Sequence, residues 1–417
     1  MNEYSANVVS LEPYDVEAIR ADFPILSREV YGKPLVYLDN GASAQKPQAV
    51  IDAISECYSN EYANVHRGLH YLSNTATDRF EAARETVRGF LNASSVNNII
   101  FTRSSTEAIN LVASSYGGMV LGEGDEIILS IMEHHSNIVP WNYHRERSGA
   151  VIKWAPVDGD GNFLMEEFEA LLTDRTKIIA ITQMSNALGT IVPVKEIIKK
   201  AHERGIKVLI DGSQSAVHMP IDVQDLDADF FVMTGHKLYG PSGIGILYGK
   251  HELLDAMPPY MGGGEMIKDV TVDGVTYGTA PHKFEAGTPP IAQAIGLGAA
   301  LDYMNKIGRD RIAEHEEMLR AYAHERLGQI NSLRILGQAK EKGAIVSFEM
   351  EGVHAHDISM VIDRSGVAVR AGTHCAQPLL QRFGVTSTCR ASFGMYNTVE
   401  EIDRLAEALI KAQDFFA

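Results

Sequence analysis

Residues 208–237 read VLIDGSQSAVHMPIDVQDLDADFFVMTGHK, and this stretch decides the fold class. It opens and closes with short apolar runs, at 208–211 and 230–234, and polar residues follow each run. Apolar runs of about four to eight residues with such boundaries are typical of strands that are buried on both faces. The stretch therefore predicts two buried strands with polar groups at their carboxyl ends.

The same pattern recurs on both sides of this stretch. Further short runs rich in Val and Ile lie at 99–102, 126–130, 151–157, 177–182 and 244–248. Amphipathic helical patterns alternate with them at 78–91, 106–116 and 194–204. Strands that alternate with helices imply a parallel sheet covered on both faces. We therefore expect an α/β domain built on a mainly parallel seven-stranded sheet.

The alternation stops near Gly287. One long helical pattern follows at 293–330, then strand-like runs at 345–349 and 367–370, and a final helix at 399–415. This order predicts a smaller α+β domain after the large one. We expect an N-terminal segment at 1–26 that packs with the small domain, a large domain at 27–295 and a small domain at 296–417.

The composition limits the possible settings and partners. The 417 residues include 37 Lys and Arg against 54 Asp and Glu, a net charge of −17, which argues against an extended nucleic-acid surface. Three scattered cysteines predict neither a disulfide framework nor a metal site. Because we find no signal peptide and no apolar stretch of membrane-spanning length, we expect a soluble, cytoplasmic protein.

The residues that follow the strands are the candidate ligand-binding groups, since open α/β sheets bind ligands beyond the carboxyl ends of their strands. Ser105 and Thr106 follow the run at 99–102 and open a helix, where hydroxyls either bind an anion or cap the helix. His134 follows the run at 126–130 and is either structural or a stacking surface.

Two further strand ends carry ionisable residues. Asp211 either caps the next helix or pairs with a protonated ring nitrogen. Lys237 is either a solvated charge or, with a lowered pKa in a cleft, an amine that forms a Schiff base. An anion cradle, a stacking ring, a carboxylate and an amine are together the set that a pyridoxal-phosphate site requires.

Longer motifs resemble a known family. The segments EHHSNIVPW at 133–141, DGSQ at 211–214, TGHKLYGP at 234–241 and FEAGTP at 284–289 resemble the class V aminotransferase-like cysteine desulfurases. RAGTHCAQP at 370–378 and CRASFGMYN at 389–397 are similar to the SufS/CsdA branch, also called group II. The resemblance runs from about residue 22 to the C-terminus and implies the pyridoxal-phosphate-dependent transferase fold of aspartate aminotransferase.

The resemblance also implies how pyridoxal 5'-phosphate is bound. Lys237 would form a Schiff base with the cofactor and shuttle the α-proton of the substrate. Asp211 would pair with the pyridinium nitrogen and Gln214 with the phenolic oxygen, while His134 would stack on the ring. The residues that would hold the phosphate are Ser105, Thr106, Thr234, His236 and, from a second subunit, Thr288.

For the substrate, the resemblance implies an L-cysteine site. Asn186 and Arg390 would bind its carboxylate, with Arg370 a further contact near the mouth of the site. Cys375 would take the sulfur as a persulfide and release L-alanine. The implied setting is a homodimer that supplies sulfur for iron–sulfur cluster assembly through a SufE-like or SufU-like acceptor, with selenocysteine lyase activity as a second activity.

Other interpretations stay open at this stage. An inert buried thiol is the alternative for Cys375, although its place between Gly372 and Pro378 indicates a loop. His374 either lowers the pKa of that thiol or points away from it. The same scaffold also carries cysteine sulfinate desulfinases and aminotransferases. A nucleotide-binding loop at 243–250 is excluded, because its glycine spacing does not fit and His251 follows the lysine.

Overall fold

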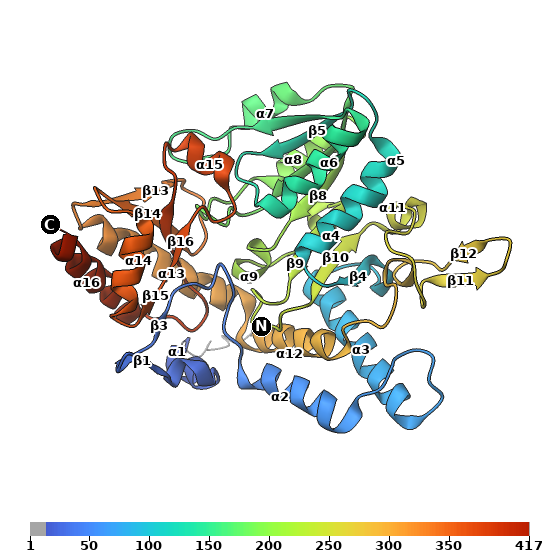
Figure 1. Cartoon of the computed structure of the whole chain (residues 1–417), viewed down its shortest axis with the longest axis horizontal. Helices are drawn as coiled ribbons and strands as arrows, with labels where there is room; N and C mark the ends of the chain where they lie inside the picture. The colour runs from blue at the N-terminus through green and yellow to red at the C-terminus, as the bar shows by residue number, and fades with distance from the viewer. Residues whose placement is uncertain (1–13, 417) are drawn as a thin grey trace, which may run out of the picture.

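The computed structural model describes residues 14–416, and its largest element is a seven-stranded sheet (Figure 1). The strands lie in the order β4-β10-β9-β8-β7-β5-β6. Their bounds are Ile99–Thr102 (β4), Glu126–Ser130 (β5), Val151–Ala155 (β6), Thr176–Thr182 (β7), Lys207–Asp211 (β8), Phe230–Thr234 (β9) and Gly245–Gly249 (β10). β10 runs antiparallel to both neighbours and the other pairs are parallel, which confirms the expected sheet.

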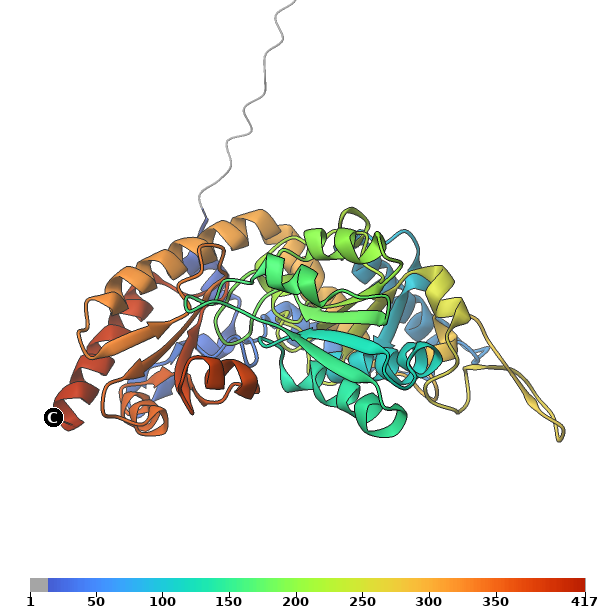
Figure 2. The same ribbon diagram turned by 90° about the horizontal axis from the view of Figure 1, so that it is seen from above.

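Alternate residues of the strands enter different hydrophobic cores, as the pleat of a strand requires. In β5, Ile127 and Leu129 belong to one buried cluster and Ile128 belongs to the other. The helices that cover the two faces are α4 (Ser105–Val112) and α6 (Val139–Ser148) on the first, and α3 (Tyr71–Phe90) and α8 (Val194–His202) on the second. Figure 2 shows the sheet between its two helical layers.

The helical pattern at 293–330 is two helices, not the single helix that its length suggests. α12 (Ile291–Ile307) and α13 (Arg309–Gly328) are separated by Gly308, whose φ is 101°. Glycine reaches a positive φ without the steric cost that a Cβ would add, and this conformation ends a right-handed helix. The expectation of one long helix is therefore wrong, because a break of one residue does not interrupt the helical hydrophobic pattern of the sequence.

A four-stranded antiparallel sheet forms the second core, with the order β13-β14-β17-β16. Its strands are Leu333–Leu336 (β13), Ile345–Met350 (β14), Arg370–Gly372 (β16) and Thr388–Ser392 (β17). α13, α14 (Ala355–Asp363) and α16 (Val399–Phe416) pack with it and share one buried cluster. This arrangement is the expected smaller α+β part.

The run at 367–370 does not form one strand. β15 (Val367–Ala368) pairs in parallel with β3 (Val36–Tyr37), and only then does β16 join the four-stranded sheet beside β17. The expectation of one continuous strand is wrong, because the chain changes pairing partners within a few residues.

The N-terminal segment contacts the end of the chain. In α1 (Val16–Ala21), Arg20 forms an ion pair of 3.1 Å with Glu401 of α16, and the Tyr14 hydroxyl donates to the carbonyl of Met395 at 2.6 Å. Residues 1–13 of the expected segment lie outside the described residues. The domain bounds at 26/27 and 295/296 stay predictions, since these contacts do not fix where a domain ends.

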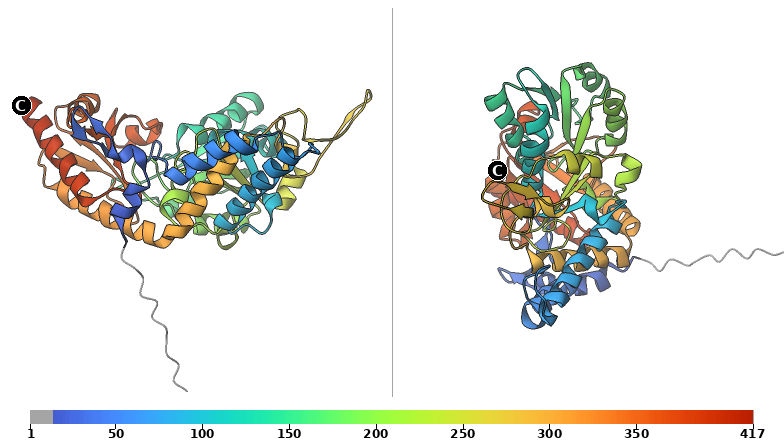
Figure 3. Two further views of the ribbon diagram at one scale, coloured as in Figure 1. Left: turned by 90° about the horizontal axis from the view of Figure 1, so that it is seen from below. Right: turned by 90° about the vertical axis from the view of Figure 1, so that its right-hand side faces the viewer.

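The remaining elements are short or lie at the periphery. They are η1 (Pro24–Ser27), β1 (Glu29–Val30), β2 (Lys33–Pro34), α2 (Gln48–Glu56), η2 (Cys57–Glu61), η3 (Val96–Asn98), η4 (Ala113–Gly117), α5 (Gly118–Val120), η5 (His135–Asn137), α7 (Met165–Leu171), α9 (Ser215–His218), α10 (Val223–Leu226), α11 (His251–Ala256), β11 (Ile267–Val270), β12 (Val275–Tyr277), η6 (His282–Phe284) and α15 (Gln377–Arg382). α2 and α3 lie beside α12, and the β11–β12 hairpin projects from the body (Figure 3). Within 14–416, no helix has the length and apolar character needed to cross a membrane.

Candidate active site

A cavity of about 610 Å³ lies between the carboxyl ends of β7, β8 and β9 and the strands β16 and β17. All but one of the predicted site residues line it: Ser105, Thr106, His134, Asn186, Asp211, Gln214, Thr234, His236, Lys237, Arg370, Cys375 and Arg390. The exception is Thr288, which is exposed in the loop after η6. Parallel strands bring their carboxyl ends to one edge of the sheet, so residues distant in sequence meet there.

Asp211 ends β8 and is buried against the start of α4. Its Oδ1 accepts hydrogen bonds from the amide of Ser213 at 3.0 Å and from the Ser213 hydroxyl at 2.6 Å. The hydroxyls of Ser213 and Ser105 lie 2.7 Å apart. Because one hydroxyl donates only one proton, Ser105 donates to Ser213 when Ser213 donates to Asp211. The carboxylate is thus held in one orientation.

The start of α4 has the chemistry of an anion site. Ser104 is the N-cap, and its hydroxyl accepts from the amide of Glu107 at 3.3 Å. Ser104, and neither Ser105 nor Thr106, therefore caps the helix. Ser105 and Thr106 follow it along the cavity wall. Thr234 faces the same cavity from the end of β9, and its buried hydroxyl has no partner among the described residues.

Lys237 lies three residues beyond β9 and lines the cavity. Burial lowers the pKa of its ammonium group to about 8. Arg390 acts in the same direction, whereas electrostatic interactions with Asp211 and Cys375 oppose the shift. A lysine whose pKa is close to neutrality can serve as a nucleophilic amine and as a proton carrier.

The loop of Lys237 is fixed by a segment that follows β3. The carbonyl oxygen of His236 accepts three hydrogen bonds, from the amide of Ala44 at 3.0 Å, the hydroxyl of Ser43 at 3.2 Å and the ammonium of Lys46 at 2.9 Å. These contacts hold the peptide group that joins His236 to Lys237.

Two histidines of the site are neutral at physiological pH. Burial, together with the positive charge of Lys237, lowers the pKa values of His134 and His236 to about 4. Nδ1 of His134 accepts a hydrogen bond from the amide of Ser136 at 3.1 Å. A neutral ring with a fixed orientation suits the stacking surface that the sequence suggests.

Five cavity-lining residues each carry a buried polar side-chain atom that has no partner among the described residues. These atoms are Oδ1 of Asn186, Oε1 of Gln214, Oγ1 of Thr234, Nδ1 of His374 and Nε of Arg390. Buried polar atoms in proteins are nearly always hydrogen-bonded, so atoms gathered without partners around one cavity indicate a polar ligand. The set contains acceptors, a hydroxyl and a guanidinium, which suits a ligand with both donor and anionic groups.

Cys375 lies in the exposed loop before α15, at the edge of the cavity. Its φ is 55° and that of His374 is 52°, an unusual conformation for residues other than glycine. The carbonyl oxygen of Cys375 accepts from the amide of His135 at 2.8 Å, so its backbone is tied to the opposite wall. The thiol is thus exposed on a fixed backbone, as the loop interpretation expects, whereas Cys57 and Cys389 are buried.

His374 points away from this thiol. Its Nε2 lies 2.8 Å from the hydroxyl of Thr388, and burial lowers the pKa of the ring to about 3. A neutral ring turned toward β17 provides no positive charge for Cys375. Of the two interpretations of His374 from the sequence, the structure favours the one without such a charge.

Several residues of the site were not predicted from the sequence. Ser213 orients Asp211, Gly41 supplies the carbonyl that accepts from Nε2 of Gln214 at 2.9 Å, and Asp39 contacts both arginines. β3 has only two residues, too few for a strand pattern, and this hid Asp39 and Gly41. The signal that could have found them is the polar stretch DNGAS at 39–43, directly after the apolar run at 35–38.

Comparisons with known proteins agree with this geometry. Residues 36–405 match the family described as aminotransferase class-V. The cysteine desulfurase of Pectobacterium atrosepticum is 51% identical over 397 residues, which cover 95% of this chain and 97% of that protein. The cysteine desulfurase of Synechococcus elongatus is 52% identical over 400 residues, which cover 96% of this chain. The chain spans 64% of the length of that relative.

Solved structures agree as well. The crystal structure of the cysteine desulfurase CsdA from Escherichia coli superposes with a TM-score of 0.90 at 41% identity, covering 97% of this chain and 99% of that one. The matches extend over nearly the whole described chain and include both sheets. The chain belongs to the class-V aminotransferase family and, within it, to the cysteine desulfurases.

Proposed function

We propose that this protein is a pyridoxal-phosphate-dependent cysteine desulfurase of the SufS/CsdA type, which moves the sulfur of L-cysteine onto Cys375 and releases L-alanine. One observation carries the proposal: the exposed thiol of Cys375 shares a single cavity with Lys237 and Asp211. An amine, a fixed carboxylate and a thiol around one cavity suit this reaction better than transamination, which needs no thiol.

The cavity fits pyridoxal 5'-phosphate. In support, Oγ1 of Thr234 offers an unused donor for a phosphate, and Oε1 of Gln214 offers an unused acceptor for a hydroxyl on the ring. When bound, the cofactor would supply an electron sink for negative charge at the substrate Cα. The residues that would hold it are Lys237 at the aldehyde, Asp211 at the ring nitrogen, Gln214 at the phenolic oxygen, His134 on the ring face, and Ser105, Thr106, Thr234, His236 and a second subunit's Thr288 at the phosphate.

Lys237 and Asp211 have distinct tasks in this proposal. The Lys237 amine, with its pKa of about 8, takes the proton from the substrate Cα and returns it, which requires a group that titrates near the working pH. Asp211 would pair with the ring nitrogen, and its carboxylate is held in one orientation for that task because both Ser213 hydrogen bonds fall on the same oxygen.

Arginines bind the other end of the substrate. Arg390 is buried, and its Nη1 donates to the carbonyl of Asn186 at 2.8 Å, so these two residues form one wall. The α-carboxylate of L-cysteine would meet Arg390 and Asn186, with Arg370 near the mouth. Charge-assisted hydrogen bonds of this kind fix the orientation of a carboxylate.

Cys375 then takes the sulfur. Its Sγ attacks the sulfur of the substrate, an S–S bond forms and the substrate C–S bond breaks with its electron pair left on carbon. A proton completes the methyl group of alanine, and a persulfide remains on Cys375. The thiolate is the form that attacks.

The setting of the reaction belongs to the same proposal. Because the backbone of Cys375 is tied to His135, the persulfide travels little, so a SufE-like or SufU-like acceptor would have to dock at the exposed loop. We propose that the sulfur supplies iron–sulfur cluster assembly, that the protein is a homodimer, and that its setting is the reducing cytoplasm, which three free thiols suit. L-selenocysteine has the same amine and carboxylate, so we propose it as a second substrate.

The test is the release of alanine from L-cysteine by the cofactor-loaded protein under reducing conditions, beside a Cys375→Ser variant. We expect alanine and persulfide from the wild type, and bound cofactor but neither product from the variant. Equal alanine from both proteins would refute the role of Cys375, and alanine from neither would refute the proposed reaction.

A further inference from the structure

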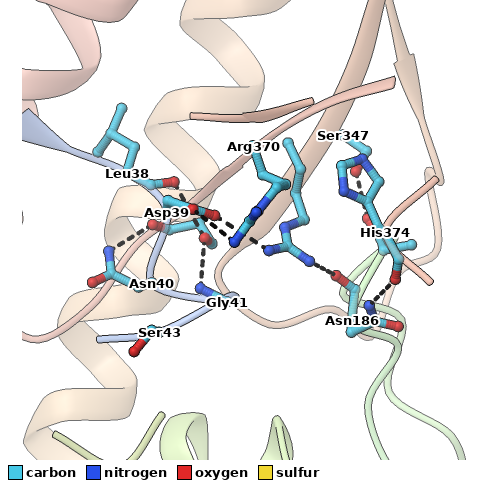
Figure 4. Close-up of polar contacts among 12 residues, drawn as sticks. Leu38, Asp39, Asn40, Gly41, Ser43, Asn186, Ser347, Arg370 and His374 are labelled. Atoms are coloured by element: carbon cyan, nitrogen blue, oxygen red, sulfur yellow. Dashed lines mark hydrogen bonds and ion pairs between the residues drawn. The ribbon is translucent and has the colours of Figure 1, made fainter. Parts of the chain in front are cut away.

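Asp39 joins two arginines of the candidate active site (Figure 4). Its Oδ2 lies 3.3 Å from Nη2 of Arg370, and its Oδ1 lies 3.4 Å from Nη2 of Arg390. The two arginines are directly opposite each other on β16 and β17. Like charges at opposed positions of neighbouring strands repel each other, so a carboxylate between them is needed to keep both side chains on one side.

The two arginines depend on Asp39 to different degrees. Arg390 is 3% exposed and donates to the carbonyl of Asn186 at 2.8 Å, so its position has independent support. Arg370 is 51% exposed, and Asp39 is its only side-chain partner in the described part of the chain. Without Asp39, repulsion from Arg390 and the entropy of a long side chain would both favour an Arg370 turned to solvent.

Asp39 itself sits on a fixed backbone. The amide of Ser392 donates to the carbonyl of Leu38 at 2.8 Å, and the amide of Gly41 donates to the hydroxyl of Ser392 at 2.7 Å. These bonds lie on both sides of Asp39 and hold it against β17. The carboxylate is therefore presented in one place before any substrate arrives.

We propose that Asp39 is a positioning residue, which holds Arg370 beside Arg390 so that both guanidinium groups meet the α-carboxylate of the amino-acid substrate. This inference rests on the proposed function, because it concerns the same substrate. Two arginines and one carboxylate leave one positive charge, which a substrate carboxylate neutralises.

The contact distances suit a shared role. At 3.3 and 3.4 Å they exceed the roughly 2.7–2.9 Å of a tight charge-assisted hydrogen bond, so Asp39 does not saturate either guanidinium. Nε of Arg390 has no partner among the described residues and stays available. Asp39 thus orients the pair and leaves donors for a second carboxylate.

The test measures ligand binding by calorimetry on the cofactor-loaded protein, with L-alanine and with ethylamine, which is L-alanine without its carboxylate. The variants are Asp39→Asn, which keeps the side-chain shape, Arg370→Ala and the double variant. We expect each single variant to raise the Kd of L-alanine about tenfold, the effect of one charged hydrogen bond, and the double variant to add less than a further twofold. The Kd of ethylamine should stay within twofold.

Three results would overturn the inference: an unchanged Kd for L-alanine, single effects that multiply in the double variant, or an equal loss for ethylamine. If Asp39→Asn does not fold, Arg370→Ala alone decides, since an unchanged Kd there removes Arg370 from the carboxylate site. Glu349→Gln, which breaks the exposed ion pair with Arg334, is the matched control and should bind L-alanine as the wild type does. The two proposals can fail separately. If the wild type binds L-alanine through these residues but releases no alanine from L-cysteine, this inference holds and the proposed function is refuted.

Discussion

Replacing Glu133 with Gln should change how the stability of this protein depends on pH. Glu133 is fully buried beside His134, and its carboxylate accepts from the hydroxyl of Ser130 at 2.5 Å, the amide group of Asn137 at 2.7 Å and the backbone amide of Thr182 at 3.0 Å. Burial nevertheless raises the pKa of Glu133 to about 7, against these hydrogen bonds. The carboxyl group therefore titrates in the folded protein close to neutral pH.

The magnitude follows from the two pKa values. The folded value of about 7 stands against 4.5 for an ordinary glutamate, and each unit corresponds to about 1.36 kcal/mol, so the difference amounts to about 3 kcal/mol. A raised carboxyl pKa means that the folded state binds the proton more tightly. The contribution to the free energy of unfolding is therefore complete below pH 4.5, declines as the pH rises and is lost above about pH 7.

The assay is denaturant unfolding of wild type and Glu133→Gln from about pH 5 to pH 8, compared as a difference at each pH. Buried histidines such as His134, whose pKa rises from about 4 to its ordinary value on unfolding, also make stability depend on pH in this range, but both proteins share them and their effect cancels in the difference. Because Gln does not titrate, the wild type should lose most of the 3 kcal/mol relative to the variant across this interval. Any loss of the Asn137 hydrogen bond in the variant adds a constant offset.

A constant difference between the two proteins over the same pH range would refute the reasoning. It would mean that the three hydrogen bonds outweigh burial and keep Glu133 ionised throughout. The exposed Glu252 of α11 offers a matched control as Glu252→Gln, since a carboxylate in water gains no such contribution on folding.

Three further substitutions test the site. Ser213→Ala removes both side-chain links to Asp211 and Ser105, so the Kd of pyridoxal phosphate, measured by equilibrium dialysis, should rise about tenfold; an unchanged Kd would show that Asp211 needs no such support. After borohydride reduction of Lys237→Ala, mass spectrometry should detect no covalently bound cofactor. An adduct on another residue would show that this residue, and not Lys237, forms the Schiff base. His374→Gln should alkylate at Cys375 with iodoacetamide at a rate within twofold of the wild type, because the His374 ring faces Thr388. A large drop in that rate would show that His374 does activate the thiol.

The sequence predicts the large sheet well because its strands are buried on both faces. Such strands appear as continuous Val and Ile runs, and polar residues mark where each one ends. That is why Asp211, at the end of β8, and Lys237, just after β9, can be predicted from their positions along the chain. Cys375 and Arg390 came from motif resemblance, since no local pattern places an antiparallel sheet beside the parallel one.

What the sequence does not predict depends on short-range geometry and long-range contact. Gly308 separates two helices with one residue, and the chain changes pairing partners between β15 and β16 around a single residue. A change of one residue does not alter a hydrophobic pattern that is read over many residues. Asp39 reaches the two arginines only because β3 pairs with β15, which lies far along the chain. No window of sequence contains both partners.

The same long-range contact makes the segment after β3 a structural link between the two halves of the site. Ser43, Ala44 and Lys46 hold the carbonyl of His236 next to Lys237, whereas Asp39 holds the arginines of the second sheet. One stretch of backbone thus fixes the positions of two groups. They are the Lys237 amine, which must reach the substrate Cα, and the pair of guanidinium groups, which must hold the substrate carboxylate. Catalysis is sensitive to displacements of about 1 Å between such groups, so a loosened segment should impair turnover before it measurably lowers stability.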